Sequence, residues 1–321
     1  MSFTHQDSHS PPPGGAGRGP FLLYLRKRAM DGMELTPEQL ETYRTRTYRF
    51  SPAPRIKNPD EALAWIDERG FAYFWPIKGI TLPSLWGTVA GDRPVGEHHD
   101  DPGHVTWGWK DGALGKRMWY YAKILRRKGT LISLEMAPYF YALSDNYGSP
   151  EEDHLVAYEE GRLTLAAKQV YEALLKDGRL NTIDLRKAAH LTSKQSDAEF
   201  NRALEVLQAD FKILPVGVAE AGAWKYAFIY EITAHHYPDL PERARTIGEA
   251  EAREKLAASY FRSVGAAQLR DLTKLFGWGP DITQRTLKRL LDRGVLTAGL
   301  TLRGQPGEWF ALPELLEVRS A

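Results

Sequence analysis

The sequence predicts a mainly α-helical protein with small β-hairpins (α+β), in which winged-helix domains follow one another along the chain. The main observation is a pattern of helices followed by a two-stranded hairpin, which occurs twice in the second half of the chain. The spacing of equivalent leucines nearly matches, with 19 positions from Leu185 to Leu204 and 18 from Leu272 to Leu290. A winged helix presents its last helix outward, and the major groove of DNA admits one α-helix. Two copies in tandem therefore indicate a long contact with duplex DNA.

The N-terminal part of the chain predicts a tail followed by short helices. Residues 1–20 are rich in Pro, Gly and Ser, so we expect a disordered tail there. Short helices are predicted over residues 21–33 and 35–50, the second beginning at Thr36. A third helix over residues 60–70 ends at a glycine, which is a common helix terminator.

Residues 107–129 form a basic, aromatic segment that we predict to be largely helical and to end at Gly129, before the β-rich run TLISLEM. The net charge of the chain is only +1 and by itself says little about DNA binding. The local cluster of basic residues is the better indication of a DNA-binding surface. Interleaved aromatic residues favour base stacking and backbone contact, although an amphipathic helix with extended lysines has the same composition. Against the single acid Asp111, the basic residues are Lys110, Lys116, Arg117, Lys123, Arg126, Arg127 and Lys128.

The last helix of each C-terminal winged-helix pattern carries polar side chains suited to DNA. In the first of these patterns, helices are predicted over residues 166–176, 182–189 and 197–207, with Thr192 or Ser193 as the cap before the third. Side chains of the outward face contact phosphates and base edges in such domains, although a solvated surface has the same composition. The expected outward residues are Lys194, Gln195, Arg202, Thr283, Gln284, Arg285 and Lys288.

Composition narrows the class of protein. A chain of 321 residues with 43% hydrophobic and 26% charged residues is typical of a soluble protein of two or three domains, and we expect it in the cytoplasm. It has no cysteine, no secretory signal and no apolar run long enough to span a membrane, so we expect no membrane partner. The patterns divide it into a tail over 1–20 and domains over 21–160, 161–245 and 246–321.

The loop EHHDDPGH is rich in possible metal ligands, yet a metal site is not the favoured interpretation. Metal sites usually place their ligands on a helix or collect them from distant elements, whereas Pro102 and Gly103 make this segment a turn. A polar surface loop, or one that lines a DNA-facing groove, is favoured, and we expect no metal and no cofactor. Its carboxylates are Glu97, Asp100 and Asp101.

The run FAYFWPIK contains Tyr73 and Trp75, which have two interpretations. Aromatic residues at this density usually belong to a hydrophobic core. Alternatively, one of the two stacks on a nucleobase, which tolerates any base because each base has a π-face. The sequence contains no phosphate-binding loop, dinucleotide fingerprint or nucleophile elbow, so motifs alone do not predict an enzyme.

The order GFAYFWPIKG, HVTWGWKDGALGKRMWYYAKIL, TLISLEMAPYFYAL and two winged helices resembles the tandem winged-helix DNA glycosylases of the crosslink-repair YcaQ and AlkZ family, and most closely the AlkZ-related proteins. The resemblance covers about residues 21–315. It implies three winged-helix domains around a DNA-binding channel, and a hydrolase that releases alkylated or crosslinked bases from double-stranded DNA.

The resemblance also implies where the chemistry would occur. Family members carry a Gln-x-Asp or Gln-x-Gln pair that positions water and stabilises the developing oxocarbenium ion. When GFAYFWPI is placed over that motif, Tyr73 takes the Gln position and Trp75 takes the Asp position. Neither residue acts as a base at neutral pH.

Three interpretations therefore stay open. The protein cleaves the N-glycosidic bond with a carboxylate from Glu97, Asp100 or Asp101; it binds DNA without catalysis; or it is a winged-helix transcription regulator. Each interpretation has double-stranded DNA as the partner, and we expect a monomer.

Overall fold

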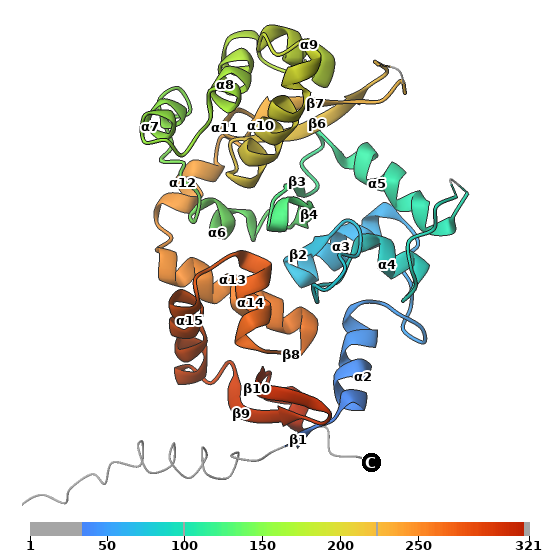
Figure 1. Cartoon of the computed structure of the whole chain (residues 1–321). Coiled ribbons are helices and arrows are strands. Elements are labelled where there is room, and N and C mark those ends of the chain that lie inside the picture. Colours follow the sequence, from blue (N-terminus) through green and yellow to red (C-terminus); the bar gives the residue numbers. More distant parts are fainter. Residues whose placement is uncertain (1–33, 99, 223, 318–321) are drawn as a thin grey trace, which may run out of the picture.

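Three sheets, each with its own helices, organise the computed structural model, which describes residues 34–98, 100–222 and 224–317 (Figure 1). Two of these sheets have three strands and one has four, of which the strand nearest the N-terminus is an addition at the edge. Apart from that added strand, the three sheets share one strand order within these residues: the first strand pairs with the third, and the third pairs with the second. The predicted tail over 1–20 and the helix over 21–33 lie outside the described residues. The described chain therefore consists of three similar units with connecting helices.

The first unit follows a short N-terminal segment. That segment contains β1 (Glu34–Leu35) and α2 (Pro37–Thr47). The helices of the unit are α3 (Pro59–Arg69), α4 (Leu85–Ala90) and α5 (Val105–Ala113), with 3₁₀ turns η1 (Pro102–His104) and η2 (Leu125–Arg127). Its sheet contains β2 (Phe71–Tyr73), β3 (Tyr120–Lys123) and β4 (Gly129–Ile132).

The second unit is reached through α6 (Ala137–Tyr141) and α7 (Asp153–Glu159). Its helices are α8 (Leu165–Asp177), α9 (Thr182–Ala188) and α10 (Asp197–Ala209), with the 3₁₀ turn η3 (Lys194–Ser196). Its sheet contains β5 (Leu180–Asn181), β6 (Ile213–Ala219) and β7 (Ala227–Ile232).

The third unit follows the connecting helices α11 (Thr233–His236) and α12 (Leu240–Arg245). Its helices are α13 (Glu249–Val264), α14 (Leu269–Phe276), α15 (Pro280–Asp292) and α16 (Glu314–Glu317). Its sheet contains β8 (Ala266–Ala267), β9 (Thr297–Leu302) and β10 (Gln305–Ala311), and β1 adds to it in parallel beside β9.

Local sequence explains many of the helix ends. The Thr36 hydroxyl accepts a hydrogen bond from the Gln39 backbone N–H, and the Gln39 side-chain oxygen accepts one from the Thr36 backbone N–H, so α2 begins with a capping box. Helix α3 ends at Gly70, whose φ of 81° favours glycine. A Cβ atom on Gly70 would lie 2.5 Å from the Ser259 hydroxyl of α13, so close packing also requires glycine there.

Two large cores hold the units together. The first joins the sheet of the first unit, through Phe71 and Tyr120, to the third unit, through Tyr260 and Phe261. The second lies within the second unit, around Leu207. The first and third units therefore share a core, to which Phe211 of the second unit also contributes, and the second unit has a further core of its own.

The prediction that residues 107–129 are largely helical is wrong. Helix α5 ends at Ala113, and β3 pairs antiparallel with β4. Gly115, with φ of 77°, follows the end of the helix. Tyr120 is fully buried and stacks on Phe211 of the second unit at 4.5 Å between ring centroids. Long-range pairing and packing therefore decide this segment, and a local pattern does not report them.

The prediction that Thr283 faces outward is also wrong, because Thr283 is fully buried in α15. Its hydroxyl donates to the carbonyl of Gly279 at 3.1 Å. Among the helices described, none combines the length and apolar composition of a membrane span.

Candidate nucleic-acid interface

The turn between β3 and β4 carries three exposed basic residues, Arg126, Arg127 and Lys128, called here the cationic turn. Arg126 and Arg127 have φ of 54° and 55°, in the left-handed region that side chains other than glycine rarely adopt. Such strain persists only where the surroundings impose it, and it is common at functional sites. Within the part of the chain that the structure describes, none of the three forms an ion pair with a carboxylate, although the charge of Arg127 acts to lower the pKa of the nearby Asp210 carboxyl.

Thr130 holds the cationic turn in place from inside the fold. Its side chain is fully buried, and its hydroxyl donates to the Lys128 carbonyl at 2.8 Å. The same oxygen accepts a hydrogen bond from the Leu125 backbone N–H at 3.2 Å. The turn packs against α10 of the second unit and α14 of the third. All three units therefore meet at this point.

Lys123 is predicted to contact DNA, but in the structure it connects two units. Its Nζ atom lies 2.9 Å from the Glu205 carboxylate of α10, and its backbone N–H donates to Gln208 at 3.1 Å. Both charged side chains of the pair are partly exposed, so the pair is worth little by itself and is screened by salt. Lys123 nevertheless already has an anionic partner.

Lys110 lies beneath the surface, with only 2% of its side chain exposed. Its Nζ atom contacts the Asp111 carboxylate at 2.6 Å and donates to the Tyr226 hydroxyl at 3.1 Å. Burial lowers the pKa of its amine, although Asp111 opposes this shift. The structure therefore places Lys110 away from any surface phosphate. The rings within 6 Å of its amine are those of Phe74, Trp107, Tyr121, Tyr226 and Phe228.

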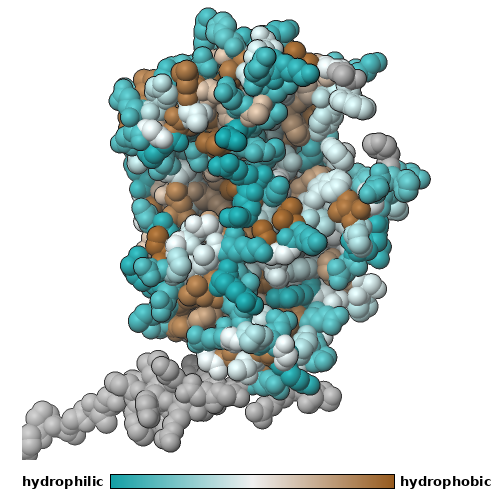
Figure 2. All heavy atoms as spheres, viewed as in Figure 1, coloured by the Kyte–Doolittle hydropathy of each residue, from teal (hydrophilic) through white to brown (hydrophobic). Residues whose placement is uncertain are grey.

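The other predicted contacts are exposed but dispersed. Lys116 and Arg117 precede β3, at the end of the strand opposite the cationic turn. The remaining exposed residues are Lys194, Gln195 and Arg202 of η3 and α10, and Gln284, Arg285 and Lys288 of α15. Helix α15 and helix α5 lie on opposite sides of the view in Figure 1. Hydrophilic side chains cover most of the face shown in Figure 2, with hydrophobic ones in small separate groups.

Tyr73 belongs to the hydrophobic core. It lies in β2, is fully buried, and its hydroxyl has no hydrogen-bond partner within the described residues. Burial raises the pKa of this phenol well above its usual value, so it stays protonated. A buried neutral phenol without a partner neither stacks on a base nor positions water.

Trp75 belongs to an aromatic cluster at the surface of the first unit. Its ring stacks on Trp86 and His104, with centroids at 6.5 and 5.6 Å. The ring of Trp107, which is 41% exposed, meets it edge-on at 5.7 Å. The cluster therefore presents the Trp107 ring outward, while Trp75 is half-buried behind it.

The carboxylates of the loop over residues 97–104 are not brought together at one site. Glu97 and Asp100 are exposed. Asp101 accepts two hydrogen bonds from the Arg93 guanidinium, each 2.8 Å long, and one from the Gly103 backbone N–H at 2.7 Å. These bonds lower the pKa of Asp101 to about 2, and the largest contribution comes from the hydrogen bonds with Arg93. Asp101 fixes the start of η1 and stays anionic at neutral pH.

Comparison with known proteins identifies the fold and the family. The family model described as "AlkZ related" matches residues 56–277, which is more than half of the chain. The chain belongs to the AlkZ-related family. This AlkZ-related chain is also similar to the solved structure of the Streptomyces sahachiroi DNA glycosylase AlkZ, with a TM-score of 0.56 at 12% identity, over 90% of this chain and 73% of that one. No curated protein sequence matches it. The predicted family and the mixed fold with small sheets are confirmed.

Sequence reasoning missed the residues that position the interface. Thr130 fixes the cationic turn. Arg93 fixes Asp101, and Tyr226 fixes Lys110. A threonine in a strand and a tyrosine after a turn carry no local signal of such roles. Tyr226 reaches Lys110 only because segments 116 positions apart come together, whereas Thr130 and Arg93 have partners within eight positions along the chain, in turns whose shape the sequence does not display.

Proposed function

We propose that this AlkZ-related chain binds duplex DNA as a glycosylase-type repair protein and that it does not hydrolyse the N-glycosidic bond. The cationic turn is the observation that carries the proposal. Arg126, Arg127 and Lys128 are exposed and form no ion pair with a carboxylate in the described chain, and the backbone of Arg126 and Arg127 is held in a strained form. Phosphate groups supply the partners that these cations lack.

We infer that the three units are winged helices. In each of them a helix precedes the first strand, two helices separate it from the second strand, and the last two strands form a hairpin. The cationic turn is then the tip of the hairpin of the first winged helix. A hairpin tip that contacts the units on both sides is well placed to follow the backbone of a duplex.

The absence of hydrolysis is inferred from the motif positions. Tyr73 is buried and protonated, and the Trp75 ring stacks on other rings, so neither side chain offers a carboxylate or an amide to an attacking water. Asp101 is bound by Arg93 and has a pKa of about 2, so it is a poor proton acceptor at neutral pH. These contacts favour recognition of DNA over hydrolysis.

The binding proposal is tested by fluorescence anisotropy with plain, N7-methylguanine-containing and crosslinked duplexes. We expect binding that weakens with salt, and a double variant Arg126→Glu with Arg127→Glu that binds every duplex more weakly. Arg245→Glu is the matched control, because Arg245 is an exposed arginine of α12 that already pairs with Glu242. An absence of binding to all three duplexes at low salt would overturn the proposal.

Hydrolysis is tested on the N7-methylguanine duplex by alkaline cleavage after incubation with excess protein. We expect no strand breaks. Breaks that disappear in Asp101→Asn would instead show that a carboxylate outside the motif has taken over the chemistry.

The regulator interpretation is tested without an enzyme assay. A regulator reads base edges and selects a consensus from random DNA, whereas a protein that reads shape or damage selects none. We expect no strong consensus.

A further inference from the structure

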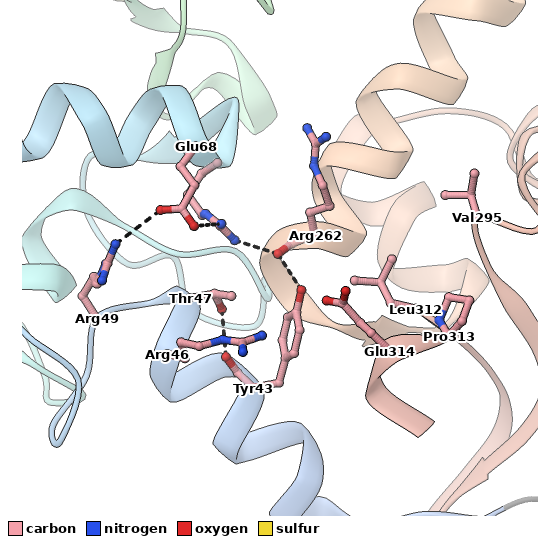
Figure 3. Close-up of a pocket in the computed structure, with 11 residues that line it drawn as sticks. Tyr43, Arg46, Thr47, Arg49, Glu68, Arg262, Val295, Leu312, Pro313 and Glu314 are labelled. Carbon is pink, nitrogen blue, oxygen red and sulfur yellow. Dashed lines mark hydrogen bonds and ion pairs between the residues drawn. The ribbon is translucent and has the colours of Figure 1, made fainter. Parts of the chain in front are cut away.

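A pocket of about 780 Å³ opens where α2, α3, α13 and the segment after β10 meet. It is lined by four arginines, Arg46, Arg49, Arg69 and Arg262, and by two glutamates, Glu68 and Glu314 (Figure 3). Its lining therefore has two more positive than negative side chains. Guanidinium groups match phosphate in shape and charge because they donate two parallel hydrogen bonds.

Arg69 forms the buried base of this arginine pocket. It is 7% exposed, and one of its terminal nitrogens donates to the Arg262 carbonyl at 2.7 Å. The other contacts Glu68, which also pairs with Arg49 at 3.3 Å. The Nε atom of Arg69 is buried and has no partner within the described residues. A buried donor without an acceptor is rare in native proteins and calls for an explanation such as a ligand.

Arg46 and Arg262 provide charge at the rim. Both are exposed, and neither pairs with a carboxylate anywhere in residues 34–98, 100–222 or 224–317. The Arg46 guanidinium lies 5.1 Å from the centre of the Tyr43 ring, and Tyr43 donates to the Arg262 carbonyl at 2.9 Å. Figure 3 shows Tyr43 pointing to that carbonyl, with Glu68 beside Arg49. Tyr43 therefore ties the two helices that carry the rim arginines.

Arg49 is held at the pocket by its backbone as well as by Glu68. Its φ of 59° lies in the left-handed region, where a residue with a side chain is strained. A left-handed residue just after the C-cap is a common way for a helix to end, and here the Phe50 backbone N–H donates to the Thr45 carbonyl of α2 at 2.9 Å. The position of Arg49 is therefore imposed by the fold.

The opposite wall of the pocket is apolar, formed by Val295, Leu312 and Pro313. Its volume is within the range of pockets that bind small molecules, roughly 300–1,000 Å³. A ligand that matches both walls has a phosphate group and a flat, weakly polar part. We propose that the arginine pocket binds a single nucleotide, either free or at the 5′-phosphorylated end of a DNA strand.

The test measures binding of dAMP, deoxyadenosine and inorganic phosphate to the full chain by isothermal titration calorimetry. We expect dAMP to bind more tightly than either part alone. The double variant Arg46→Gln with Arg262→Gln should lose at least about tenfold in affinity for dAMP, because it removes two charge-assisted contacts. Arg245→Gln should bind dAMP as the unchanged chain does.

Thermal unfolding serves as the control for correct folding of the double variant. Because Arg46 and Arg262 are exposed, their replacement should hardly change the midpoint of unfolding. No heat from dAMP at millimolar concentration with folded protein would overturn the proposal, and so would unchanged affinity in the double variant. Competition with single strands that carry a 5′-phosphate or a 5′-hydroxyl assigns the source of the nucleotide. Displacement by the phosphorylated strand alone indicates a strand end, and displacement by neither strand indicates a free nucleotide.

This inference does not depend on duplex binding by the cationic turn. Arg126→Glu with Arg127→Glu should leave dAMP binding intact, and Arg46→Gln with Arg262→Gln should leave duplex binding intact. Two results together would overturn the proposal: the unchanged chain does not bind dAMP, and the double variant at Arg46 and Arg262 loses duplex binding. These arginines would then belong to the surface that contacts duplex DNA.

Discussion

The Nζ atom of Lys110 lies 3.1 Å from the hydroxyl of Tyr226, which ties α5 of the first unit to the hairpin of the second. Tyr226 in turn donates to the Asp111 carboxylate at 3.0 Å, so the three side chains form a closed set of contacts. A lysine expected at a DNA surface thus joins two units. Its charge is balanced inside the protein, and this has consequences for stability.

We expect Lys110→Met to lower the free energy of unfolding by about 1–3 kcal/mol, because it removes hydrogen bonds and the charge that balances Asp111. Urea denaturation followed by circular dichroism measures the change. Lys116→Met is the control, since exposed Lys116 should change stability by less than about 0.5 kcal/mol. Equal effects in the two variants would show that the buried contacts of Lys110 contribute nothing.

The strained cationic turn predicts opposite effects of two glycine substitutions. Arg127→Gly relieves a left-handed φ and should raise the free energy of unfolding by roughly 0.5–1 kcal/mol. Lys128 has an extended φ of −112°, so Lys128→Gly should lower the free energy of unfolding by a similar amount. Each variant loses one cation, and both should bind duplex DNA more weakly. A loss of stability in Arg127→Gly as large as in Lys128→Gly would contradict the role of strain.

Tyr73 and Tyr120 form a matched pair for the cost of a buried hydroxyl. Both are fully buried, but the Tyr120 hydroxyl shares a hydrogen bond of 3.2 Å with Thr233, and the Tyr73 hydroxyl has no partner in the described chain. Tyr120→Phe should lower the free energy of unfolding by about 1 kcal/mol. Tyr73→Phe should leave it unchanged or raise it, because a buried group without a partner is costly. A clear loss in Tyr73→Phe would mean that its hydroxyl has a partner in solution.

The Arg93–Asp101 pair predicts a dependence of stability on pH. Because the folded pKa of Asp101 is lowered to about 2 from 3.8, its contribution is present above the unfolded pKa and is lost as pH falls through the folded value. Asp101→Asn should therefore be less stable than the unchanged chain at pH 7, and the gap should narrow between about pH 4 and pH 2. Urea midpoints over this range measure the gap. A gap that is constant down to pH 2 would show that charge is not what Asp101 contributes.

Elements with local signals were predictable. Helix α2 begins at Thr36, helix α3 ends at Gly70, and the helices and hairpins of the second and third units follow from leucine spacing and turn residues. These features depend on neighbours a few residues apart along the chain, which a sequence displays directly. The family could be identified for the same reason, since motif order is a property of the chain.

The hairpin of the first unit and the candidate site depend on distant segments. Strand β3 forms because β4 pairs with it and with β2, and because Phe211 of the second unit covers Tyr120. Lys110 is buried because Tyr226 lies beside it, although 116 positions separate them. The arginine pocket collects residues from both ends of the described chain.

By itself, the sequence determined the helical character, the repeated helix and hairpin pattern and the family of this protein, because capping, periodicity and motif order are local. Only the tertiary structure decided which of its cations are free. Burial and pairing across the fold engage Lys110 and Lys123 and leave Arg126, Arg127 and Lys128 exposed. The reason is physical: the state of a charge depends on its neighbours in space, which are set by contacts between residues far apart in the chain.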